Sequence, residues 1–359
     1  MGLSTIVAVD NRPEMLTNFL DRLLPSLKIG EDELILVSDA CRDARVLKCL
    51  KQVARSTESV KVIFLNEKVG YGPACNIAAQ KAETEILVFI NTDVFPDLGA
   101  AQILADEVQA DPNVGAAQGL LIYPQTNRVQ STGHIFHDYL NFHALEGRKV
   151  DDYLVQQRQE RQALTSAFYA IRRETFQQFG GFDEFFFNAW EGLELSLRLK
   201  NSGMRCIYTP AARAFHVRGG GRRHFLLDET QQSAYFWAKW GSRIQNDLVA
   251  LLERQLTPQL KSLNYFAVNC GSTSTWRQTL KQLGLKIQSQ IEVPDRFEEQ
   301  VCLYDNLAHT VSTHPTPLLF FSDHFEQLAR NRAWFSARRA STDLVIDLRG
   351  NVMLGVDLA

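Results

Sequence analysis

A short polar insert interrupts an apolar stretch of the chain and carries the first candidate for chemistry. The stretch runs from Glu85 to Phe95, and the insert is Asn91, Thr92 and Asp93. An apolar run of this length is typical of a strand buried on both faces of a parallel sheet. A carboxylate directly after such a strand is costly unless a cation or hydrogen-bond donors meet it. We therefore predict that Asp93 is a functional residue at the carboxyl edge of a sheet, where open α/β sheets bind ligands.

Other strand candidates in the N-terminal third end in the same way. Each apolar run stops at a carboxylate or amide and is followed by a helical pattern, which predicts a parallel sheet of βα units. Right-handed crossovers bring the polar residues at these strand ends, here called tips, to one edge of the sheet. Each tip alone is equally well explained as a turn former or helix cap, but four together favour a site. The tips are Asn11, Asp39, Asn66 and Asp93, after strands expected at 4–9, 33–37, 60–65 and 86–90.

A second dense stretch begins at the glycine pair Gly180-Gly181, which breaks the preceding helix. A helix with an apolar stripe is expected over 191–200, and the acidic residues in its first turn suit the helix dipole.

A histidine and a basic, glycine-rich loop follow this helix. His216 precedes Arg218, Arg222 and Arg223. Guanidinium groups match phosphate geometry, so the loop is suited to bind phosphate, and a solvated loop explains the sequence nearly as well.

The composition excludes several classes of protein. A net charge of −3 gives no electrostatic basis for nucleic-acid binding. No apolar run approaches a membrane span, and the first residues enter a strand without the pattern of a signal peptide. The six cysteines form no CxxC pair, and the spacing of His134, His137 and His143 fits no compact metal motif. We expect a cytoplasmic protein with reduced thiols, for which peripheral association with the inner face of a membrane stays open.

Taken in chain order, these segments resemble an inverting glycosyltransferase of family 2 with the GT-A fold, over roughly residues 4 to 240. The segment from Val129 to Gly133 resembles the branch that includes rhamnosyltransferase-like enzymes of surface polysaccharide synthesis. The segments that carry the resemblance are Asn11-Arg12, Ser38-Asp39, the loop with Asn66, Gly70 and Asn76, the tip Asn91-Thr92-Asp93, residues 180–184, Trp190-Glu191 and His216.

The resemblance implies a UDP- or dTDP-sugar as donor, a hydroxyl of a glycan or glycoconjugate as acceptor, and Mn²⁺ or Mg²⁺ as cofactor. Asp93 and His216 would hold the cation, and Asp39 would bind the nucleobase. Trp190 and Glu191 would border the acceptor. The other positions that it assigns to the donor are Asn11, Arg12, Asn66, Gly70, Asn76, Asn91, Thr92 and Arg218.

Two positions depart from the family pattern. Asn91 stands where the family usually has the first aspartate of Asp-x-Asp, a change that rhamnosyltransferase-like members share. Gly192 stands where the helix usually carries the general base, and glycine cannot take a proton. Three explanations stay open: Glu191 is the base, Glu194 is the base, or the domain has lost catalysis and only binds nucleotide sugar or acts as a scaffold. We favour Glu191 as the base. The simpler interpretation of Glu191 is a charge that stabilises the helix N-terminus.

Alternating strand and helix patterns return after an aromatic-rich helical pattern over 225–256. We expect an α/β architecture with a GT-A domain over 1–240, in which a Rossmann-like, mostly parallel sheet is central. A helical connector over 241–262 and a small α/β domain of unknown role over 263–359 would follow. The segment 271–274, Gly-Ser-Thr-Ser, fits a phosphate cradle or, more simply, a plain β–α turn. Further strands are expected at 265–268, 301–304, 318–321 and 344–348.

Overall fold

The computed structural model describes residues 2–217, 226–270, 273–292, 315–322, 338 and 341–354. The chain forms two compact units, each described by itself below. The first comprises Met1–His134 with His143–Ile244, and the second comprises Ile135–Phe142 with Gln245–Ala359. The domain limits expected at residues 240 and 262 stay a prediction.

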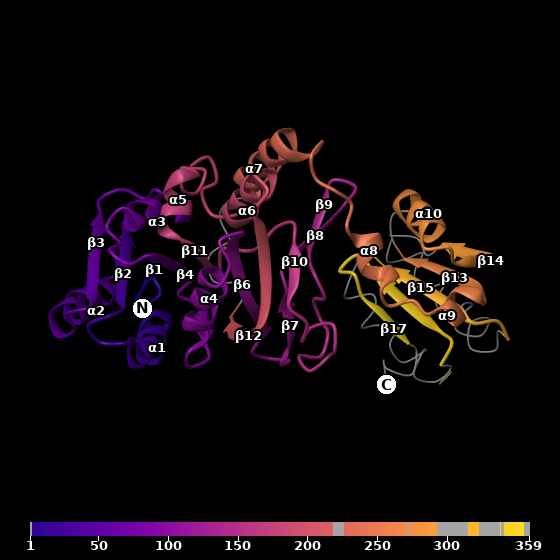
Figure 1. Cartoon of the computed structure of the whole chain (residues 1–359), viewed down its shortest axis with the longest axis horizontal. Coiled ribbons are helices and arrows are strands. Elements are labelled where there is room, and N and C mark those ends of the chain that lie inside the picture. Colours follow the sequence, from indigo (N-terminus) through magenta and orange to yellow (C-terminus); the bar gives the residue numbers. More distant parts are fainter. Residues whose placement is uncertain are drawn as a thin grey trace. The chain divides into compact units, whose positions relative to one another are not determined.

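One sheet organises the first unit (Figure 1). Its strands are β1 (Leu3–Val9), β2 (Glu33–Asp39), β3 (Val60–Leu65), β4 (Ile86–Ile90), β5 (Val94–Pro96), β6 (Val114–Tyr123), β7 (Arg128–Ser131), β10 (Gln159–Arg161), β11 (Phe168–Arg172) and β12 (Arg205–His216). They lie in the order β10-β12-β6-β11-β4-β1-β2-β3, with β5 paired to β12 and β7 paired to β6.

The first four strands of the chain run parallel to one another within this sheet, and β6 and β12 form a further parallel pair. β1 pairs in parallel with β2 and β4, and β2 pairs in parallel with β3. Leu34 to Val37 of β2 are fully buried, as their apolar run predicts. The strand order reverses at β1, so the carboxyl ends of β1 and β4 lie where such sheets bind ligands. The predicted α/β fold with a mostly parallel central sheet is confirmed.

Alternate residues of the strands supply two cores, one on each face of the sheet. Val7 and Val9 of β1 belong to the core that includes α1, α2 and α4, whereas Ile6 belongs to the core that includes α3, α5 and α6. Both faces of the central strands are therefore covered, because successive side chains point to opposite sides. The helices are α1 (Pro13–Leu23), η1 (Leu24–Ser26), α2 (Ala44–Ser56), α3 (Tyr71–Ala79), α4 (Ala100–Gln109), α5 (Arg173–Gln178), α6 (Glu191–Asn201) and α7 (Leu226–Trp240).

Strand β12 is longer than the sequence indicates. The apolar run Cys206-Ile207-Tyr208 by itself predicts only a short strand, but β12 continues to His216. Pro210 lies within it, and the pairing with β6 shifts register between Thr209 and Arg213. A proline cannot donate to the ladder, and an irregularity of this kind accommodates it.

The sequence from Gln162 to Ile171 has the pattern of one strand, but β11 begins only at Phe168. The residues before it pack against α6, because Leu164 N donates to Ser196 Oγ over 3.1 Å. β11 then pairs antiparallel with both β4 and β6. Ala163 makes only an isolated β-bridge with His134, and Thr165 N donates to Gln118 Oε1 over 2.8 Å. The expectation of a strand over residues 162–167 is therefore wrong, because side chains take the place of a continuous strand partner.

The second unit contains a mixed sheet in the order β14-β13-β15-β16-β17, in which only β16 and β17 pair antiparallel. The strand expected at 301–304 and residues 271–272 lie outside the described residues. The elements are α8 (Leu248–Glu253), α9 (Pro258–Ser262), β13 (Asn264–Cys270), α10 (Thr273–Gln282), β14 (Lys286–Glu292), β15 (Leu318–Ser322), β16 (Leu344–Asp347) and β17 (Val352–Leu354).

A hairpin from the middle of the chain also belongs to the second unit. β8 (His134–His137) pairs with β9 (Leu140–His143), and residues Ile135–Phe142 of this hairpin group with the C-terminal segment. Phe136 is buried, its N–H donates to Asp247 Oδ1 over 2.7 Å, and its carbonyl accepts from Asp247 N. The second unit is therefore discontinuous in sequence.

Candidate functional site

Asp93 lies in the short turn between β4 and β5, at the edge of the sheet that the sequence predicts. The residue is 8% exposed, and its two carboxylate oxygens face different partners. Oδ2 lies 3.3 Å from Nη1 of Arg12, and Oδ1 lies 3.4 Å from Nε2 of His216. Burial raises the pKa of Asp93, but His216, when its ring is protonated, and Arg12 outweigh it and hold that pKa below its ordinary value. The carboxylate is therefore ionised at neutral pH.

Sheet pairing brings His216 to Asp93 from the far side of the sequence. β12 runs antiparallel to β5 with His216 opposite Val94, and Val217 N donates to the Asp93 carbonyl over 2.9 Å. On the other side of the imidazole, Nδ1 lies 2.6 Å from Oε1 of Gln130. The two predicted metal ligands are therefore neighbours, and the ring of His216 is held between Asp93 and Gln130.

Arg12 joins the tips of β1 and β4. It is the N-cap residue of α1, and Pro13 opens that helix. Its Nε donates to Asp10 Oδ2 over 2.6 Å, and its Nη2 lies 3.4 Å from Thr92 Oγ1. These contacts hold a guanidinium beside Asp93, in a geometry suited to phosphate.

Two other predicted donor residues bind the backbone of neighbouring loops. Asp39 accepts from Val69 N over 2.8 Å and from Gly70 N over 3.1 Å. Asn11 Oδ1 accepts from the N–H groups of residues 42–43 at 2.7 and 3.0 Å. Both side chains thus fix loops that border the carboxyl edge of the sheet. Their contacts with a nucleotide stay a prediction.

The loop after β3 depends on a glycine. Gly70 has φ of +92°, and a Cβ at this position would lie 2.3 Å from the carbonyl oxygen of Phe187. That same carbonyl accepts from Tyr71 N over 2.8 Å, so the loop lies directly against the segment before α6.

Asn66 is exposed, and Asn91 carries a buried Oδ1 with no hydrogen-bond partner among the described residues.

Asn76 binds the turn around Gly181. Its Nδ2 donates to the Phe182 carbonyl over 2.9 Å, and its Oδ1 accepts from Phe182 N over 2.8 Å. Nδ2 also lies 3.2 Å from Glu184 Oε1. These contacts give Asn76 a structural role, whereas its predicted part in the nucleotide pocket stays a prediction.

Trp190 and Glu191 open helix α6. Trp190, the N-cap residue, has φ of +75°, an uncommon value for a bulky residue, and its ring packs 4.6 Å from that of Phe236. Glu191 is 3% exposed, and its Cγ lies 3.3 Å from where a Cβ on Gly72 would be. The carboxylate predicted as general base therefore lies between α3 and the first turn of α6. Strained backbone of this kind is concentrated at functional sites.

Gly192 is required by packing. A Cβ at this position would lie 2.4 Å from Ser166 N and 2.9 Å from the carbonyl oxygen of Leu164. These contacts are with backbone atoms, so a side chain would force the loop before β11 away from α6. The close approach of that loop accounts for a glycine where the family pattern has an aspartate.

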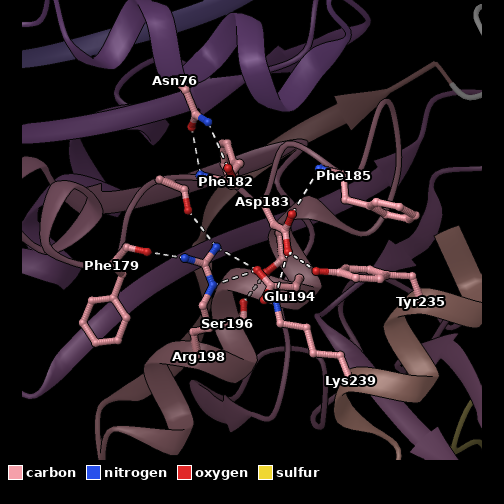
Figure 2. A network of polar contacts seen from close by, with 12 residues as sticks. Asn76, Phe179, Phe182, Asp183, Phe185, Glu194, Ser196, Arg198, Tyr235 and Lys239 are labelled. Atoms are coloured by element: carbon pink, nitrogen blue, oxygen red, sulfur yellow. Dashed lines mark hydrogen bonds and ion pairs between the residues drawn. The ribbon is translucent and has the colours of Figure 1, made fainter.

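Glu194 is committed to a buried ionic network (Figure 2). Its side chain is fully buried, with Oε2 2.7 Å from Arg198 Nη2 and Oε1 2.8 Å from Lys239 Nζ. Lys239 also lies 2.8 Å from Asp183 Oδ2, and Tyr235 donates to the same oxygen over 3.1 Å. The network ties α7 to α6 and to the turn before it, so Glu194 is poorly placed to accept a proton from a substrate.

The sequence also singles out three arginines and three histidines. Arg218, Arg222 and Arg223 lie outside the described residues. The rings of His134 and His143 pack 4.4 Å apart, and His137 Nδ1 lies 2.7 Å from Asn246 Nδ2. Across the described ranges, no three or more His, Cys, Asp or Glu side chains gather as a metal site.

Sequence reasoning missed two side chains that shape this site. Gln130 fixes His216, and Lys239 bridges Asp183 and Glu194. The segment around Gln130 stands out in the sequence only through the resemblance, and Lys239 lies on a helix far along the chain. Both become recognisable only once strand and helix pairing is known.

No helix within the described parts of the chain is long and apolar enough to cross a bilayer.

The chain belongs to family 2 of the glycosyltransferases. The profile described as "Glycosyl transferase family 2" matches residues 4–179, and that described as "Glycosyl transferase family group 2" matches residues 93–283. The two matches together include both sides of the Asp93–His216 pair. The predicted family is confirmed, and its members are transferases.

Named relatives match the same part of the chain. "O-antigen biosynthesis protein RfbC" of Myxococcus xanthus is 28% identical over 247 residues, which is 67% of this chain and 19% of the relative. "N-acetylglucosaminyl-diphospho-decaprenol L-rhamnosyltransferase" of Mycobacterium tuberculosis is 24% identical over 227 residues, 55% of this chain and 71% of the relative. The match thus spans only about a fifth of the Myxococcus protein.

Solved structures share the fold. "GalNAc-T7 with UDP, GalNAc and Mn2+" has a TM-score of 0.57 at 14% identity, covering 88% of this chain and 58% of that one. A mannosyltransferase from Pyrobaculum calidifontis "in complex with GDP-Man and Mn2+" has a TM-score of 0.53 at 15% identity, covering 94% and 85%. At these identities the likeness establishes the GT-A fold.

Proposed function

We propose that the first unit transfers a sugar from a UDP- or dTDP-sugar to a hydroxyl of a glycan or glycoconjugate acceptor, with inversion at the anomeric carbon. The observation that carries this proposal is the approach of Asp93 Oδ1 to His216 Nε2, 3.4 Å apart and beside Arg12. The pair lies where the strand order reverses, the usual ligand position in such sheets. The names of the Myxococcus and Mycobacterium relatives support a surface polysaccharide as the product.

A divalent cation, Mn²⁺ or Mg²⁺, fits between Asp93 and His216. A carboxylate oxygen and an imidazole nitrogen suit Mn²⁺ in particular, and the facing pair leaves other coordination positions to diphosphate oxygens and water. When bound, such a cation supplies positive charge that stabilises the leaving diphosphate. Arg12 adds a second positive group on the other oxygen of Asp93. The solved neighbours that contain Mn²⁺ are consistent with this choice.

Glu191 is our candidate for the general base. Its neighbour Trp190 would border the acceptor, and Glu191 would take the proton of the attacking hydroxyl. Glu194 is held by Arg198 and Lys239 and is the weaker candidate. Because packing accounts for Gly192, that glycine is not by itself a sign of lost catalysis.

Calorimetric titration with UDP, dTDP and GDP, with and without Mn²⁺, tests the donor site. We expect one nucleotide to bind only with Mn²⁺, and Asp93→Asn to abolish that binding. Asp97→Asn, in an exposed position directly after β5, should leave it unchanged. A nucleotide affinity that is the same with and without Mn²⁺, and the same in wild type and Asp93→Asn, would contradict the proposed site.

A second candidate function is nucleotide-sugar binding or scaffolding without turnover, which stays open because position 192 carries no proton acceptor. It predicts that a bound donor is never consumed. Transfer to a glycan acceptor that is lost in Glu191→Gln would exclude it.

A further inference from the structure

Gln130 makes two contacts with the same histidine. It lies in β7, is 2% exposed, and places Oε1 2.6 Å from His216 Nδ1. Its Nε2 donates to the backbone carbonyl of His216 over 3.4 Å. One buried side chain thus holds both the ring and the backbone of a predicted metal ligand.

The two contacts together settle which way the amide of Gln130 points. The carbonyl of His216 can only accept, so the group of Gln130 that faces it must be the NH₂ donor. The amide oxygen is then left to face Nδ1, and an oxygen acceptor requires a hydrogen on that nitrogen. In the neutral imidazole, Nδ1 therefore carries the proton and Nε2 carries the lone pair.

That tautomer has a consequence on the other side of the ring. The lone pair of Nε2 faces Asp93 Oδ1 at 3.4 Å. Two acceptors at this separation cannot hydrogen-bond to each other when the ring is neutral. They offer two lone pairs to a cation between them, which is the arrangement that a hard or borderline divalent metal requires.

The backbone around Gln130 is irregular, and this bears on where its side chain points. In the pairing of β6 with β7, Leu121 lies opposite Ser131 and Ile122 lies opposite Val129, with a register shift between them. Gln130 is therefore an extra residue without a partner in β6, which is a β-bulge. Bulges beside active sites re-aim a side chain that regular alternation would point elsewhere.

We propose that Gln130 is a positioning residue that fixes His216 in its Nδ1–H tautomer and turns Nε2 toward Asp93, so that the pair binds Mn²⁺. The part of this proposal that concerns Mn²⁺ binding rests on the proposed function. A ligand histidine whose other ring nitrogen donates to a fixed acceptor is oriented by it, and loss of such a partner typically weakens metal binding by 10- to 100-fold.

Gln130→Met tests this proposal because methionine keeps the length of the side chain and removes the acceptor. The matched control is Gln159→Met. Gln159 is also buried, and its Nε2 also donates to a backbone carbonyl, that of Leu154, but it lies on β10. The first readout is the tautomer of His216 in the metal-free protein, measured by long-range ¹H–¹⁵N correlation at a pH where the ring is neutral. His216→Ala assigns its signals.

The second readout is the affinity for Mn²⁺ with inorganic pyrophosphate, measured by electron paramagnetic resonance. We expect wild type and Gln159→Met to show the Nδ1–H form. Gln130→Met should move His216 toward the Nε2–H form, which can donate to Asp93, and should weaken Mn²⁺ binding about tenfold or more.

An unchanged tautomer in Gln130→Met overturns the proposal, and so does unchanged Mn²⁺ affinity where His216→Ala loses it. If His216→Ala itself leaves Mn²⁺ affinity unchanged, the metal role in the proposed function fails, and the metal part of this proposal fails with it. The tautomer readout still decides whether Gln130 positions the ring.

Discussion

Asn76 and Phe182 exchange two hydrogen bonds although 106 positions separate them in the chain. The side-chain amide of Asn76 donates to the backbone carbonyl of Phe182 and accepts from its N–H, as the backbone of a neighbouring strand would. A Cβ on Gly181 would lie 2.5 Å from Asn76 Oδ1, so the turn fits the amide closely. The pair fixes the segment before α6 to α3, and with it the position of Glu191.

We expect Asn76→Asp to destabilise the first unit. Aspartate keeps the acceptor but loses the donor, and it places an oxygen against the Phe182 carbonyl. The free energy of unfolding should fall by about 1–3 kcal/mol, the usual cost of an unsatisfied buried group. Urea unfolding measures it, with Asn66→Asp at an exposed position as the control. Equal stability of the two variants would show that the exchange contributes nothing.

Asp183 should make the stability depend on acid pH. Burial raises its pKa, but hydrogen bonds from Lys239, Tyr235 and the backbone outweigh this, and the net pKa lies below the ordinary value of 3.8. A group whose pKa is depressed by folding stabilises the fold above its unfolded pKa, and this contribution is lost as the pH falls through the folded pKa.

Asp183→Asn should therefore show a smaller loss of stability than wild type on acidification below about pH 4. Unfolding midpoints measured across the acid range test this. Asp21→Asn, at an exposed position of α1, should follow the wild-type curve. Parallel curves for wild type and Asp183→Asn would rule out the linkage.

Gly192→Ala should destabilise the protein, because the added Cβ meets the backbone of Ser166 and Leu164. Overpacking of this kind costs about 1–3 kcal/mol. Thermal unfolding measures the loss, and Asn201→Ala, exposed at the end of the same helix, serves as control. Gly192→Asp should be at least as destabilising and should not raise transfer activity. A faster Gly192→Asp enzyme would instead identify the glycine as a lost base.

Glu191→Gln separates catalysis from binding. If Glu191 is the base, kcat should fall by about 10²–10⁴-fold, since the amide cannot take a proton. Nucleotide and Mn²⁺ affinities should stay near wild type. The measurement is initial-rate transfer with sugar donors that carry the nucleotide identified by calorimetry, and Glu174→Gln, exposed on α5, is the control. An unchanged rate in Glu191→Gln would remove Glu191 from the mechanism.

The sequence predicts the central sheet well because its strands are buried on both faces. Apolar runs such as that of β2 have no amphipathic alternative, and each ends at a polar tip, so Asp93 could be placed at the edge. The contact of Asp93 with His216 could be expected only through the family resemblance. It depends on β12 continuing past Pro210 to pair with β5, which no local pattern indicates.

The same limit applies to residues whose side chains bind backbone. Asn11, Asp39 and Asn76 were expected to meet the donor, and the structure gives each of them backbone amides of a distant segment. A carboxylate or amide serves either purpose, so its type alone cannot distinguish them. Glu194 was an open alternative for the base, and only the positions of Arg198 and Lys239 reveal its ionic partners.

The discontinuity of the second unit has a consequence for synthesis and for dissection of the chain. Phe136 leaves the ribosome 111 residues before Asp247, the residue that binds its backbone. The hairpin must therefore wait, with its apolar side chains uncovered, until the C-terminal segment has been made. For the same reason a cut near residue 244 does not yield two complete halves: one fragment would carry an orphaned hairpin, and the other would lack it.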